Sequence, residues 1–333
     1  MKAVSALALL ALLAMPVASA EELPYSTRSR PFTGWSSTAR GDIRTVGMAG
    51  ATVGLADTFL ATGSNPAGLA MTLGGADLTF ASNTVHDSHI QSFEETIASN
   101  SYGTALSGYP WGIGFGYRSP YGEGAPYTVG GTPVLPKIST RMAELSIARV
   151  FENTVSLGVG ISLGQGEIEI DDTRGNSSAY HSYAVGANFG IMFQLPNRFL
   201  LAGSHSTPMK FSAATADNPS PIIAGFYQPI EMPSRSTLGL GWIPNRFFRA
   251  DFDLAYIGST PTTALIRDET ALVGENGVYI PRLGAAYTFI DYKELHGTVF
   301  GGTYFETARE ESTSNRIHVT SGIEIKPWVL TIG

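Results

Sequence analysis

From about residue 76 onward, apolar side chains alternate with small or polar ones at a period of two. In residues 155–164, for example, Val, Leu and Ile alternate with Ser and Gly. This spacing predicts a β-strand, because successive side chains of a strand point to opposite faces of the sheet. The pattern returns in residues 111–118, 185–193, 237–242, 248–256, 282–289 and 317–325. We therefore expect an all-β, antiparallel structure of about twelve strands, and at most fourteen.

The two faces of these strands differ in a way that indicates a membrane. In residues 248–256 one face carries Phe, Leu and Tyr, whereas the other carries Arg249, Asp251 and Asp253. Three charges would be costly in the apolar core of a soluble β-sandwich, which is the alternative for such alternation. A transmembrane β-barrel instead turns its apolar face to lipid and its polar face to the lumen. Only 15% of all residues are charged, against about 25% in soluble domains.

The first twenty residues read as a secretory signal peptide. Lys2 is followed by an apolar run and by the small-residue site Ala18-Ser19-Ala20, so we expect cleavage after Ala20. No later apolar run reaches the roughly twenty residues that a membrane-spanning helix needs. The expected location is the outer membrane of a Gram-negative bacterium, with multiple crossings of the membrane. The chain has no Cys, which excludes disulfides and thiol chemistry.

Residues 41–75 do not alternate, and they read as short helical turns broken by Gly and Pro. Asn65 suits a cap position and Pro66 suits the first turn of a small helix. A segment this compact could plug the lumen, or it could form an ordinary periplasmic strand and turn before the barrel. We expect a signal peptide at 1–20, a helical hatch or plug at 21–75 and the barrel at 76–333.

Turn signals divide the barrel region. Short turns are expected at Glu152-Asn153, Pro196-Asn197 and Pro244-Asn245, which would lie at the periplasmic end. Longer polar stretches, expected as extracellular loops, cover residues 86–100, 119–139, 167–178, 211–233 and 258–276.

The stretch from Gly47 to Ala70, GMAGATVGLADTFLATGSNPAGLA, resembles the hatch of the FadL/TodX family of outer-membrane long-chain fatty acid and aromatic hydrocarbon transporters. Weaker similarity continues at residues 186–191, 199–208 and 232–241. The matching hatch positions are Gly47, Gly50, Asp57, Asn65, Pro66, Ala67 and Gly68. The motif is shared with PorV-like components of secretion systems, so it predicts the architecture better than the substrate.

Two features depart from this family. Its members have fourteen strands, whereas about twelve are expected here. Residues 328–333 read as the start of a strand, so we expect either a smaller barrel or a record that lacks its last strands.

The resemblance implies passive transport of hydrophobic compounds, either long-chain fatty acids or aromatic hydrocarbons, through a hatch-gated barrel. The alternative is a PorV-like structural or secretion barrel that binds protein partners. Release in the family is lateral, next to a kinked strand, and Tyr109-Pro110 is the candidate kink here. The residues that bind the ligand cannot be assigned from the sequence.

No enzyme is expected. His86 and His89 form a possible metal pair without further ligands. The acidic residues Glu167, Glu169, Asp171 and Asp172 read as a solvated loop face, with binding of divalent cations between lipopolysaccharides as the alternative. We expect no cofactor and no metal. The net charge of −7 and the lack of a basic stripe argue against nucleic acid. The expected partners are a hydrophobic ligand, outer-membrane lipid and lipopolysaccharide, and the barrel-assembly machinery, with the protein itself a monomer.

Overall fold

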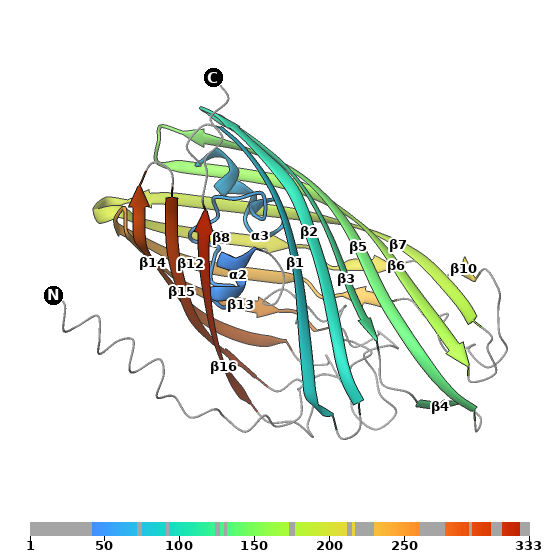
Figure 1. Cartoon of the computed structure of the whole chain (residues 1–333). Helices are drawn as coiled ribbons and strands as arrows, with labels where there is room; N and C mark the ends of the chain where they lie inside the picture. The colour runs from blue at the N-terminus through green and yellow to red at the C-terminus, as the bar shows by residue number, and fades with distance from the viewer. Residues whose placement is uncertain are drawn as a thin grey trace.

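The structure is a computed structural model of the 333-residue chain (Figure 1). It describes residues 42–71, 75–90, 93–123, 127–129, 132–172, 177–211, 215–216, 230–259, 277–292, 295–307 and 315–326. The predicted signal peptide and residues 327–333 lie outside these ranges. No helix in the described ranges is long and apolar enough to cross a membrane.

Within the described ranges, twelve strands pair side by side in chain order, each antiparallel to the next, which confirms the predicted antiparallel architecture. They are β1 (Gly75–Ile90), β2 (Phe93–Gly108), β3 (Trp111–Glu123), β5 (Thr132–Phe151), β6 (Val155–Asp172), β7 (Ser177–Leu195), β8 (Phe199–Ser206), β12 (Arg235–Asn245), β13 (Phe248–Ile257), β14 (Val278–Tyr292), β15 (Leu295–Glu306) and β16 (Arg316–Lys326). None of the described pairings joins β16 back to β1.

Four short strands lie off this path. At the sheet, β4 (Tyr127–Val129) pairs with β5, and β10 (Thr215–Ala216) pairs with β7. Separate from the sheet, β9 (Met209–Phe211) and β11 (Ile230–Met232) pair with each other.

Several strands are longer than the sequence predicts. The expected loops at 86–100, 119–139 and 167–178 are mostly strand, because β1, β2, β3, β5, β6 and β7 continue through them. A transmembrane strand needs only about 9–11 residues, so strands of 16–20 residues extend beyond the hydrocarbon core. Beyond the lipid, the outward face of a strand meets water and needs no apolar side chains. This explains why the ends of these strands read as polar loops.

The apolar rows face outward, as predicted. On β6 the side chains of Leu157, Val159, Ile161 and Leu163 are 46–52% exposed, whereas Ser156 and Ser162 are buried. On β13, Phe252 and Leu254 point outward while Asp251 and Asp253 are buried in the lumen. A surface that is apolar outside and charged inside is the arrangement of a membrane barrel rather than of a soluble sandwich.

Residues 42–71 form the hatch, drawn in blue within the curve of the sheet in Figure 1. It consists of α2 (Ile43–Gly47), α3 (Ala61–Ser64) and the 3-10 helix η2 (Pro66–Ala70), with irregular backbone between them. Asn65 caps η2 and Pro66 occupies its first turn, as the sequence predicts. The apolar hatch residues, among them Met48, Phe59 and Leu69, are almost completely buried.

Glycines on the inner face of the sheet let the hatch backbone approach the wall. A Cβ atom on Gly284 would lie 2.6 Å from the Cβ atom of Met48, and one on Gly239 would lie 2.6 Å from the amide nitrogen of Gly54. Any side chain at these positions would displace the hatch. The Gly-rich face of the predicted strands is therefore the surface against which the plug packs.

Candidate functional site: the hatch and the cavity above it

Two aspartates of β13 hold the hatch by its backbone. One carboxylate oxygen of Asp253 accepts hydrogen bonds from the amides of Thr52, at 2.9 Å, and Val53, at 3.0 Å. Asp251 accepts one from the amide of Leu55, at 3.1 Å. Both carboxyl groups are buried, where an amide that lost its acceptor would remain unsatisfied. The charges that the sequence places on the inner face of this strand therefore bind the plug.

Other strands of the barrel bind the hatch from different directions. Ser146 of β5 and Ser156 of β6 donate hydrogen bonds to the carbonyls of Thr62 and Ala67, at 2.8 and 2.7 Å. On β16, Thr320 donates to the carbonyl of Gly47 at 2.9 Å. β5 and β6 are neighbours in the sheet, whereas β16 lies at the far end of the strand order, so the hatch connects widely separated parts of the wall.

The hatch motif residues have distinct positions in this plug. Asn65 is fully buried, and it joins two hatch segments by donating to the carbonyl of Val53 at 3.1 Å and accepting from the amide of Ala67 at 3.3 Å. Pro66 and Ala67 follow it in η2, against Gly158 of β6. A Cβ atom on Gly68 would collide with the backbone of Ala56.

The first half of the motif forms a tight turn and an ion-pair cluster. Gly47 ends α2 and packs on Phe300, while Gly50 follows it with a positive φ of 73°. Asp57 forms ion pairs with Arg44 of the hatch and, at 3.2 Å, with Arg249 of β13. Burial lowers the pKa of Arg44, but the nearby charges of Asp57 and Asp42 outweigh it and raise the pKa above its ordinary value.

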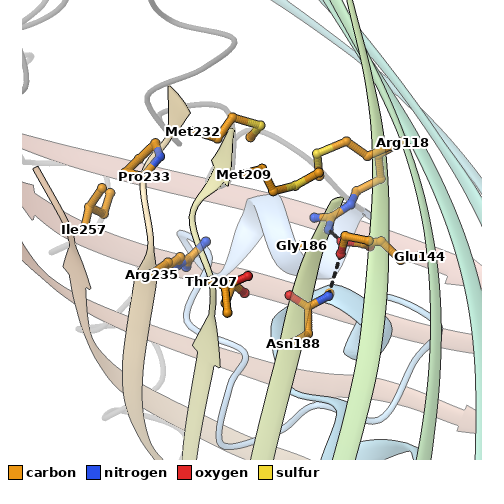
Figure 2. Close-up of a pocket in the computed structure, with 14 residues that line it drawn as sticks. Arg118, Glu144, Gly186, Asn188, Thr207, Met209, Met232, Pro233, Arg235 and Ile257 are labelled. Atoms are coloured by element: carbon orange, nitrogen blue, oxygen red, sulfur yellow. Dashed lines mark hydrogen bonds and ion pairs between the residues drawn. The ribbon is translucent and has the colours of Figure 1, made fainter. Parts of the chain in front are cut away.

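A cavity lies in the lumen beside the hatch (Figure 2). Gly63 of the hatch lines it, together with the ends of β8, β12 and β13 that point away from the short turns. The cavity therefore lies between the hatch and the end of the barrel that carries the long loops. Its lining consists of Gly63, Arg118, Met142, Glu144, Ser162, Gly186, Asn188, Ser206, Thr207, Met209, Met232, Pro233, Arg235 and Ile257.

One side of the cavity is polar. Arg118 of β3 forms an ion pair with Glu144 of β5, which is only 3% exposed. Ser162 connects this pair to Asn188 of β7, since Asn188 donates to Ser162 at 2.7 Å and Ser162 lies 3.5 Å from Glu144. The Gly63 backbone packs directly against the ion pair, because a Cβ atom there would collide with both side chains.

The other side of the cavity is apolar and comes from the β9–β11 hairpin. Figure 2 shows Met209 and Met232 around the same hollow as Arg118 and Arg235. After Thr207, which exchanges two hydrogen bonds with Ala187 of β7 at 2.9 Å, the chain leaves the wall. Met209 and Phe211 then pack inside against the glycines of β6 and β7. Methionine is a flexible side chain that adapts to ligands of irregular shape.

Sequence reasoning missed this hairpin and the cavity residues. Residues 211–233 were expected to form an extracellular loop, but β11 and the end of β9 fall within them and line the lumen. The only local signal is Pro208, which cannot donate in a β-ladder and precedes the first inward methionine.

The structure corrects the prediction that Tyr109-Pro110 kinks a strand. Tyr109 and Pro110 do not interrupt a strand, because they form the short turn between the end of β2 at Gly108 and the start of β3 at Trp111. Proline suits such a turn because its fixed φ and missing amide proton are tolerated there. The apolar strands on either side explain why the sequence reads as one interrupted strand.

No protein-family model and no curated protein matches the sequence. Among solved structures, the Pseudomonas putida toluene transporter TodX is similar at 12% identity and a TM-score of 0.53, covering 90% of this chain and 88% of that one. The monoaromatic hydrocarbon channel CymD gives 12% identity and a TM-score of 0.57, with coverage of 87% and 98%. The Ralstonia pickettii toluene transporter TbuX is 9% identical with a TM-score of 0.52, and the match covers 92% of this chain and 98% of that one. The chain thus shares the fold of the FadL/TodX family.

Proposed function

We propose that this barrel is a passive outer-membrane channel for hydrophobic compounds, with the luminal cavity as its ligand site and the hatch as its gate. The observation that carries the proposal is the position of the cavity, which Gly63 of the hatch and the methionines of the β9–β11 hairpin both line. Three structural neighbours, at low identity, are described as a toluene transporter, a monoaromatic hydrocarbon channel and a second toluene transporter. A concave site inside the lumen favours a small ligand over the PorV-like role of binding protein partners.

We infer that the ligand carries an anionic or hydrogen-bond-accepting group in addition to its apolar part. Arg118 has the carboxylate of Glu144 as its partner, but Arg235 lines the cavity and has no ion-pair partner among the described residues. A guanidinium that faces only hydrocarbon would lose hydration without compensation. The carboxylate of a long-chain fatty acid would supply the missing partner, whereas toluene would not.

The experiment measures binding of palmitate and of toluene to the purified, refolded barrel and to the variant Arg235→Met. Methionine keeps the apolar stem but removes the charge. Hydrogen bonds to charged groups contribute about 1.5–3 kcal/mol, so palmitate affinity should fall roughly 10- to 100-fold. Toluene affinity should stay the same or rise.

Arg246→Met is the matched control, because Arg246 is an exposed arginine in the turn between β12 and β13. Equal palmitate affinity in wild type and Arg235→Met would contradict the proposed anionic ligand and favour a hydrocarbon. If neither palmitate nor toluene binds and neither crosses vesicles containing the protein, the transport proposal itself is wrong.

A further inference from the structure

The outer face of β7, β8, β12, β13 and β14 carries two cross-strand rows of different chemistry. The row nearer the long-loop end is polar and aromatic, and consists of Phe189, His205, Ser236, Tyr256 and Tyr279. The next row toward the short turns is aliphatic, and consists of Ile191, Gly203, Leu238, Leu254 and Pro281. A girdle of aromatic residues above an apolar band marks the level at which the membrane interface meets the hydrocarbon.

The aliphatic row has a gap at Gly203. A Cβ atom there would point outward and touch only Ile191, at 3.3 Å, and Leu238, at 3.8 Å. The gap forms part of a groove on the outside of the barrel, whose walls include Phe189, Leu254 and Tyr279. On β8 itself the outward residues on either side of Gly203 are Leu201 and His205, so the gap is one residue long.

The upper end of the groove is polar. His205 Nδ1 lies 2.8 Å from Ser236 Oγ, and both side chains face outward beside Gly203. The second ring nitrogen of His205 has no hydrogen-bond partner among the described residues. A polar group on the lipid-facing side of a barrel is costly unless water or a polar lipid group satisfies it.

We propose that this groove binds one acyl chain of a membrane phospholipid, with the lipid's ester or phosphate oxygens beside His205 and Ser236. The apolar base and the polar upper end match the two parts of such a lipid in the order in which the membrane presents them. A second copy of the chain is the poorer fit, because a stable protein interface needs a contact of about 1,000 Å² or more. The proposal concerns the outside of the barrel and does not depend on what passes through the lumen.

The test uses the full chain reconstituted in phosphatidylethanolamine vesicles, extracted in mild detergent and examined by native mass spectrometry. Gly203→Phe should fill the groove and reduce the retained lipid by about tenfold or more, which is the loss expected for two buried methylenes. His205→Ala should also reduce it, because the polar end is lost. Ala143→Phe is the matched control, since Ala143 lies on β5 between Tyr117 and Leu163 and away from the groove.

Each outcome decides the proposal. Loss of lipid in Gly203→Phe, with retention in wild type and Ala143→Phe, supports it. Equal retention in all variants, equal loss in Ala143→Phe, or a bound mass that is not a phospholipid overturns it. Folding of each variant is checked by its heat-modifiable electrophoretic mobility. Should Gly203→Phe fail to fold, Gly203→Ala adds a single methyl group at the same place and should show a smaller loss in the same direction.

Discussion

At the scale of single residues, Asp253 joins the barrel to two backbone amides of the hatch. Its carboxylate accepts two hatch amides, and truncation in Asp253→Ala leaves both donors unsatisfied. The two bonds together should contribute about 3 kcal/mol, so hydrogen exchange at residues 52–53 should accelerate roughly 100-fold. The measurement is hydrogen–deuterium exchange of the refolded barrel in detergent.

The partial substitution Asp253→Asn keeps one acceptor oxygen and should accelerate exchange less than alanine does. Glu152→Ala, in the exposed turn between β5 and β6, is the control and should leave hatch exchange unchanged. If exchange at residues 52–53 is as slow in Asp253→Ala as in the wild type, other contacts hold this segment and the role assigned to Asp253 is wrong.

At the scale of the elements, alternation predicts a strand wherever one face must meet lipid. This requirement explains why β6 and β13 are readable from sequence, including which face is outward. It no longer acts at the extended ends of β1 and β2, which therefore read as a loop. The β9–β11 hairpin could not be predicted because its inward position depends on the glycines of β6 and β7, which are distant in sequence.

The inner face of β14 provides an element-scale prediction. Gly284→Val would place a side chain against Met48, which is fully buried and precedes two residues with positive φ, Ala49 and Gly50. Residues held in the left-handed backbone region change conformation only at considerable free-energy cost. The turn at Ala49 and Gly50 should therefore keep its shape, and the hatch should move away from the wall. The barrel should still fold, because its lipid-facing side is unchanged, and it should admit large dyes into vesicles.

Ala285→Val is the matched control for this change. Ala285 is the next residue on the same strand and lies on the opposite, outward face. Dye permeability that rises equally in both variants would mean that general weakening of β14, and not displacement of the hatch, opens the lumen.

At the scale of the whole molecule, the question is whether the hatch must move for a ligand to pass. The chain has no Cys, so an engineered pair can form only one intramolecular disulfide. A Cβ atom on Gly116 of β3 would lie 2.7 Å from Thr62 Oγ1 of the hatch. Thr62→Cys with Gly116→Cys therefore brings the two Cβ atoms within reach of the roughly 3.5–4.5 Å separation of a disulfide.

Oxidation of this double variant should lock the hatch to the wall and stop palmitate entry into vesicles, and reduction should restore it. Each single variant, treated with the same oxidant, should transport palmitate in both states. A locked barrel that still admits palmitate would show that ligands bypass the hatch. Since Thr62 and Gly63 adjoin the Arg118–Glu144 pair, only a loss of transport with palmitate binding retained separates a closed gate from a damaged site. Palmitate affinity of the oxidised protein must therefore be measured alongside its entry.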